Sequence, residues 1–210
     1  MQIVDINPEE AAQEETPQQE EAPAQEEAPA EEAPPPTDTA ELFFTDVEVD
    51  DSCVLGKVGE GWAQAAANLN WERLMLTLTS LAGARMCLED AARYARERKA
   101  FNRAVADFPP VAGYLASMER KILLGRALAH RALDRLVNHQ ECRALVAAAK
   151  RMVCDDAVWI ADRAIQIHGG YGYTTEYPPE RWWRDLRLMP IGGGTSEIMA
   201  GIIAKELSRE

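Results

Sequence analysis

Apolar side chains recur every three to four residues along three long stretches of the chain, which is the spacing of one buried face of an α-helix. Many of these positions are Ala or Gly, which favours close approach between neighbouring helices. With a further helix from about Ser196, the pattern predicts an all-α fold, a four-helix bundle. The three stripes are Leu81, Ala84, Leu88, Ala91 and Ala95; Leu115, Met118, Ile122, Gly125, Ala129, Ala132 and Leu136; and Val153, Ala157, Ile160, Ala164 and Ile167.

The ends of these helices are marked by capping and breaking residues. The first helix is expected over about residues 60–98, and Asp107 is expected to cap the second, with Pro109 and Pro110 in its first turn. The third is expected to stop at Gly169-Gly170. The Pro- and Trp-rich stretch that follows is predicted as a loop leading to the last helix.

One strand-like run precedes the helices. The stretch "AELFFTDVEVDD" carries Leu42, Phe44, Val47 and Val49 in loose alternation. A lone strand needs partners for its edges, and the sequence offers no other convincing strand. The expected organisation is a tail over residues 1–40, a residual strand and connection over 41–58, and the helical bundle over 59–210.

The acidity of the chain is confined to its beginning. Residues 1–42 hold thirteen of the 35 acidic residues and no Lys or Arg, so the remainder balances 22 acids with 22 bases. The repeated "EEAPA" composition predicts a disordered tail or tether, with docking to a basic partner as the alternative. The neutral remainder gives no electrostatic reason to expect nucleic-acid binding.

Cysteine usage and hydropathy indicate the compartment. The four cysteines stand far apart without paired metal-ligand spacing, and three of them fall in predicted helices, where we expect them buried and reduced. No apolar run approaches the roughly 20 residues that cross a bilayer. We therefore expect a cytoplasmic protein with no membrane span, no metal site and no signal peptide.

Four stretches carry a resemblance to a known family. They are "ELFFTDVEVDDSCVLGKVGEGW", "WERLMLTLTSLAGARMCLEDAARYARERKAFNR", "AIQIHGGYGYTTEYPPERWWRDLRL" and "PIGGGTSEIMAGIIAKEL". In this order and spacing they resemble the C-terminal part of an acyl-CoA dehydrogenase, a flavoprotein oxidoreductase of fatty acid or branched-chain acyl-CoA metabolism. The resemblance covers residues 41–207.

The resemblance implies a fold and an assembly. The family has an N-terminal helical domain, a middle β-domain and a C-terminal four-helix bundle, and this chain is expected to hold only the bundle and the last strand of the β-domain. It also implies a homo-oligomer, or a hetero-oligomer with a chain that supplies the other domains. The acyl-CoA substrate would bind in the complete assembly.

The family pattern also implies a catalytic base. Many members place a glutamate just before the Gly-Thr-Ser, but Gly193 stands there in this chain and has no side chain. Other members, which resemble long-chain and isovaleryl-CoA dehydrogenases, place the base in an "ERL"-like motif, here Glu72-Arg73-Leu74. Glu72 is thus the expected base, with Arg73 and Gly194 at the substrate, and the family fold brings positions 72 and 193 to one point.

The expected contacts with FAD are carried over in the same way. Arg98 is expected at the pyrophosphate and Phe101 near the adenine, since Arg presents a bidentate donor to phosphate. The segment "QIHGG" resembles the one that lies against the FAD of a neighbouring subunit. Pro109 and Asn102 depart from a usual Gln and Gly. The remaining expected cofactor-binding residues are Gln166, His168, Gly169, Gly170, Thr195 and Glu197.

Two functional hypotheses stay open at this point. In the first, the chain is part of an acyl-CoA dehydrogenase that desaturates an acyl-CoA when the missing domains are supplied. In the second, it is a non-catalytic helical bundle kept for oligomerisation or interaction and tethered by the acidic tail. A truncated reading frame is a third explanation of the length. The retained Glu72, Arg98 and "GTSEI" favour the first.

Overall fold

The computed structural model describes residues 41–208, and the tail predicted over residues 1–40 lies outside them. The chain divides into two units at residue 50. In the first unit, residues 41–49 form no helix or strand. The strand predicted there is wrong for this chain, because a strand requires a hydrogen-bonded neighbour and the described residues provide none.

The second unit is all-α apart from one short hairpin, which confirms the expected class. A 3₁₀ turn over Asp51–Cys53 precedes α1 (Gly61–Ala67) and α2 (Leu69–Glu97), so the single helix expected over 60–98 is interrupted at Asn68. The hairpin pairs β1 (Lys99–Ala100) with β2 (Arg103–Ala104), and a 3₁₀ turn over Val105–Asp107 follows. The other helices are α3 (Pro109–Val137), α4 (Arg143–His168), α5 (Gly170–Tyr173), α6 (Pro179–Leu188) and α7 (Ser196–Leu207).

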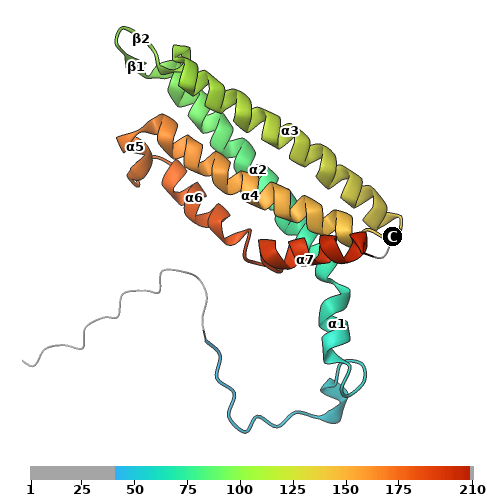
Figure 1. The fold of residues 1–210 in the computed structure, drawn as a ribbon. Helices are drawn as coiled ribbons and strands as arrows, with labels where there is room; N and C mark the ends of the chain where they lie inside the picture. The colour runs from blue at the N-terminus through green and yellow to red at the C-terminus, as the bar shows by residue number, and fades with distance from the viewer. Residues whose placement is uncertain (1–40, 209–210) are drawn as a thin grey trace, which may run out of the picture. The chain divides into compact units, whose positions relative to one another are not determined.

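Helix α4 lies at the centre of the bundle and packs on α2, α3, α6 and α7 (Figure 1). The fourth position of the bundle is filled by α6 followed by α7. The residues between them, 189–195, form the glycine loop. The Pro- and Trp-rich stretch predicted as a loop thus contains α6, which begins with Pro179 in its first turn. Proline suits that position because the first helical N–H has no intrahelical partner.

The three stripes predicted from the sequence form the core. Ala84, Ala91, Met118, Ala129 and Ile160 are among their fully or nearly fully buried members. Small residues let the helices approach closely, as the spacing indicated. A Cβ on Gly125 of α3 would lie 3.0 Å from Val153 of α4 and 3.1 Å from Leu81 of α2.

The helix ends follow the predictions in part. Helix α4 ends at Gly169, which has φ +61, and Thr195 caps α7 by accepting a hydrogen bond from the Ile198 N–H. Asp107 is not the cap of α3, because that helix has Phe108 at its N-cap and no side-chain cap bond. Cys87 and Cys154 are buried free thiols inside helices, whereas Cys142 is buried just before α4. Among residues 41–208 no helix is both long enough and apolar enough for a bilayer.

Candidate active site

The glycine loop between α6 and α7 is held by two cationic side chains from different helices. Arg73 Nε, from α2, donates to the Gly193 carbonyl at 3.0 Å, and Lys150 Nζ, from α4, donates to the Gly194 carbonyl at 2.7 Å. Gly193 and Gly194 have φ of +65° and +108°, a conformation that glycine adopts without steric cost. Glycine thus suits both positions, and the loop is anchored from both sides.

Both of these cations are buried. Lys150 has no exposed surface and Arg73 is 7% exposed. Burial lowers the pKa of each side chain, because it disfavours the charged form. No salt bridge forms between either one and a carboxylate among residues 41–208. The carbonyls of the glycine loop are thus the main compensation for bringing two charges out of water.

Glu72 lies beside this anchor. It stands in the first turn of α2, its side chain is exposed, and its neighbour Arg73 reaches Gly193. The structure thus brings the start of α2 to the glycine loop. A Cβ on Gly193 would point at Leu76 Cδ1, 2.8 Å away, with Arg73 and Lys150 next nearest. A side chain at 193 would therefore start inward, toward α2 and α4.

A cavity of about 560 Å³ opens at the same end of the bundle. Arg73 and Arg143 supply two guanidinium groups, and the positive charge of Arg143 adds to the lowering of the Arg73 pKa. The rest of the lining is mostly apolar: Trp62, Ala66, Leu69, Ile198 and Ile202, with Asn70. Two cations beside apolar walls suit a ligand with an anionic group and a hydrocarbon part.

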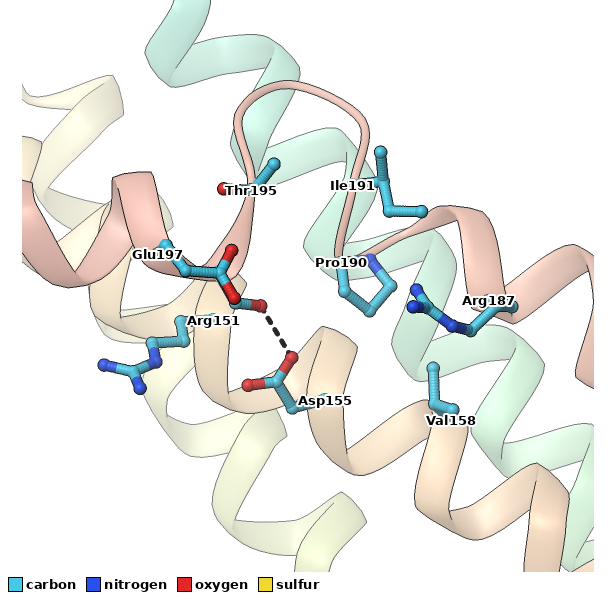
Figure 2. A pocket seen from close by; sticks show the side chains of 9 residues that line it. Arg151, Asp155, Val158, Arg187, Pro190, Ile191, Thr195 and Glu197 are labelled. Carbon is cyan, nitrogen blue, oxygen red and sulfur yellow. Dashed lines mark hydrogen bonds between the residues drawn. The ribbon is translucent and has the colours of Figure 1, made fainter.

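A second cavity, of about 420 Å³, lies at the N-terminus of α7 (Figure 2). Ser196 Oγ donates to the Asp155 carboxylate at 2.7 Å, and Arg151 and Arg187 stand on opposite sides. A hydrogen bond from its own backbone N–H is the main cause of the lowered pKa of Glu197. This wall combines a helix N-terminus, guanidinium groups and carboxylates, so it offers partners for phosphate and for hydroxyl groups.

The remaining predicted site residues gather at the other end of the bundle. His168, at the end of α4, is 4% exposed, its Nδ1 hydrogen-bonds the Ala164 carbonyl at 2.8 Å, and its ring stacks on Tyr94 with centroids 4.2 Å apart. Burial lowers the pKa of His168. These contacts make it a packed ring that orients the end of the helix.

Around His168 the other residues of this cluster face outward. Phe101 is 91% exposed at the hairpin turn, with φ +51, which is unusual for an aromatic residue. The Arg98 guanidinium lies 5.7 Å from the centre of the Tyr171 ring. Gln166 is exposed, and a Cβ on Gly169 or Gly170 would meet nothing within 4 Å. This end of the bundle thus presents an open surface.

The predicted residues therefore form two separate groups. Arg73 near the glycine loop and Tyr94 beside His168 are 21 residues apart on α2, which is about 30 Å at 1.5 Å per residue. Glu72, Arg73, Gly194, Thr195 and Glu197 lie at one end, and the "QIHGG" group lies at the other. The structure does not bring the two groups of one chain together.

Sequence reasoning missed two cations of the site. Lys150 and Arg143 both lie on α4, and a cation on a helix usually indicates a solvated surface. Lys150 nevertheless falls on the apolar stripe, three residues before Val153 and four after Val146, and that placement could have marked it. Arg143 has no such signal, because only the folding of α2 against α4 brings it to Arg73.

Comparison with known proteins identifies the family of the helical bundle. The family model described as "Acyl-CoA dehydrogenase, C-terminal domain" matches residues 59–208. The chain belongs to the acyl-CoA dehydrogenase family. An acyl-CoA dehydrogenase of Bacillus subtilis is 38% identical over 171 residues, which cover 81% of this chain and 45% of that protein.

Solved structures agree with this family membership. The crystal structure of acyl-CoA dehydrogenase from Geobacillus kaustophilus has a TM-score of 0.77 at 33% identity, covering 79% of this chain and 43% of that one. PigA with FAD and proline has a TM-score of 0.75 at 27% identity, with the same coverage of both chains. This chain thus spans somewhat less than half the length of the acyl-CoA dehydrogenases that it matches.

The donor chemistry of the described residues is compatible with a phosphate-bearing cofactor such as a flavin nucleotide. The cavity at α7 provides the helix N-terminus at Thr195 and two guanidinium groups, Arg151 and Arg187, for a diphosphate. At the other end, Gly169 and Gly170 leave open the space that side chains would fill. The α7 cavity thus offers donors for phosphate, and the two glycines leave room for a ligand at the other end.

Gly193→Ala is expected to destabilise the folded chain by about 1–2 kcal/mol, the cost of a left-handed conformation for a residue with a Cβ. The new methyl group would also displace Leu76 Cδ1, now 2.8 Å from its position. The measurement is the free energy of unfolding by urea. Gly201→Ala, in the middle of α7 with nothing within 4 Å, is the control and should gain about 0.5–1 kcal/mol. Equal effects of the two substitutions would contradict this account of the loop.

Proposed function

We propose that this chain takes part in the flavin-dependent α,β-dehydrogenation of an acyl-CoA thioester, within an assembly that provides the remaining domains of the enzyme. The observation that carries the proposal is the Arg73 anchor. One residue links the start of α2, the glycine loop and the cavity with two guanidinium groups. The proposed base, the glycine loop and the proposed anion site thus lie at one end of the bundle.

Glu72 is the proposed base. Removal of a proton next to the thioester carbonyl requires an acceptor within hydrogen-bond reach. Gly193 has no side chain for this task, and Glu72 is the carboxylate adjacent to the anchor. Its exposure in this chain leaves it free to face a substrate held between the bundle and another domain.

Arg73 and Arg143 are the proposed binding groups for the anionic part of the acyl-CoA, with the apolar walls of their cavity beside it. Glu72 would take the α-proton, and the electrons of that C–H bond would form the new double bond. FAD, when bound, would supply the acceptor for the hydride that leaves the β-carbon with its electron pair. Thr195 and Glu197, at the start of α7, are proposed to hold FAD at this end of the bundle.

The second group of residues supports an oligomer. Arg98, Phe101, Gln166 and the glycines after His168 lie about 30 Å from the first group along α2 and on an open surface. We propose that they contact the cofactor of a neighbouring protomer. In this arrangement each cofactor site takes residues from two copies of the bundle.

The test is complementation in trans. The full chain is co-expressed with the N-terminal part of the Bacillus subtilis relative, the part that this chain does not match. The expected result is co-purification of the two chains with FAD and conversion of an acyl-CoA to a product lighter by two hydrogens, followed by mass spectrometry. A folded complex that never takes up FAD would instead favour a non-catalytic interaction module.

A further inference from the structure

Lys150 is the most unusual charged group in the molecule. Its ammonium-bearing side chain has no exposed surface, because it lies on the buried face of α4 among small and apolar residues. Burial of an ammonium group costs several kcal/mol unless hydrogen bonds compensate, and the compensation here is the Gly194 carbonyl at 2.7 Å. A charge held in this way calls for an account beyond helix packing.

The hydrogen bond fixes the orientation of one peptide group. The peptide that joins Gly194 to Thr195 is planar and trans, so its N–H points opposite to its carbonyl. Because the carbonyl is directed at Lys150, inside the bundle, the Thr195 N–H is directed away from α4. That N–H donates to no backbone carbonyl in the described part of the chain.

The preceding peptide is held in the same sense. Arg73 Nε binds the Gly193 carbonyl, so the Gly194 N–H is likewise turned away from the Arg73 side chain. Two successive N–H groups are thus set by two buried cations. Thr195 also lines the cavity at the start of α7, together with Ser196 and Glu197.

We propose that Lys150 is a positioning residue: it holds the Gly194 carbonyl inward, and so presents the Thr195 N–H to the bound cofactor. Its task is orientation rather than stability. Met at position 150 removes the desolvation cost of the ammonium group but leaves the Gly194 carbonyl without its donor, and a glycine-rich loop without its anchor gains many conformations. The cofactor part of the proposal rests on the proposed function.

The decisive variant is Lys150→Met, with Lys205→Met as the matched control on the exposed surface of α7. In the full chain alone, hydrogen exchange of the Ile191 and Gly192 amides, which donate to the Leu188 carbonyl, should become roughly 10-fold faster when the loop loses its anchor. Exchange within α2 and α4 should stay unchanged, and the free energy of unfolding should fall by no more than the loss of one hydrogen bond. In the complemented assembly, the Kd for FAD should rise by roughly 10-fold.

Lys150→Arg keeps a cationic donor and should recover most of the FAD affinity. The proposal would be overturned if the Lys150→Met chain unfolds. It would also be overturned if the loss of FAD affinity is no larger than the loss in free energy of unfolding, because Lys150 would then have a structural role alone. Faster loop exchange with unchanged FAD affinity would overturn it as well. If the parent assembly takes up no FAD, the proposed function fails, and loop exchange in the chain alone still decides whether Lys150 orients the loop.

Discussion

Glu72→Gln is expected to slow the chemical step of the complemented assembly by roughly 10²–10⁴-fold, which is the usual contribution of a positioned general base. Glutamine keeps the shape of the side chain but cannot accept the α-proton. FAD uptake and acyl-CoA binding should be retained, because Arg73 and the glycine loop are unaltered. The measurement is the rate of flavin reduction in a single turnover.

The matched control is Glu89→Gln. Glu89 is an exposed carboxylate on the same helix, away from the glycine loop. The Glu89→Gln substitution should leave the rate of flavin reduction within about a factor of two of the parent, roughly the scatter of surface substitutions. An unchanged rate in Glu72→Gln would remove Glu72 from the chemistry, whatever else the assembly does.

Arg143→Gln is expected to raise the Kd for acyl-CoA by roughly 10-fold, which corresponds to the loss of one charge-assisted hydrogen bond at the low end of its range. The loss of affinity should be at the low end because the Arg143 side chain is exposed to water. The rate of flavin reduction at saturating substrate should not change, since Arg143 binds the anionic part and not the reacting carbons. Equilibrium titration of the complemented assembly provides the measurement.

Arg131→Gln, an exposed cation on α3, separates a local effect from one of net charge. It should leave the Kd unchanged. If both substitutions weaken binding equally, the cavity of Arg73 and Arg143 is not the anion site. If Arg143→Gln lowers the saturated rate but not the affinity, the assigned role is wrong.

The core of the bundle could be predicted from the sequence because burial follows helical spacing. Ala91, Ala129 and Ala164 all fall on predicted stripes and all are fully buried. The start of α6 could not be predicted in this way, because Pro178 and Pro179 suggest a loop and only packing shows that Pro179 opens a helix. The strand predicted within residues 41–58 is wrong for the opposite reason, since its local pattern finds no hydrogen-bonded partner among the described residues.

The backbone of the candidate site can be related to its residue types. Gly193 and Gly194 have positive φ, and Thr195, which is expected at the cofactor, is the N-cap of α7. Lys150 and Arg143 could not be assigned, because their roles depend on which helices lie side by side. The family resemblance gave Glu72 its expected role, and that role remains a prediction.

Anaerobic flavin bleaching shows whether this bundle supplies the base and the anion site of a flavin-dependent dehydrogenase. The full chain, assembled with the N-terminal part of its Bacillus subtilis relative, is titrated with an acyl-CoA under argon. We expect loss of the oxidised flavin absorbance in the parent, and a rate of flavin reduction roughly 10²–10⁴-fold lower in Glu72→Gln. An assembly that holds FAD but is never bleached by acyl-CoA, or is bleached equally fast without Glu72, would contradict this role of the bundle.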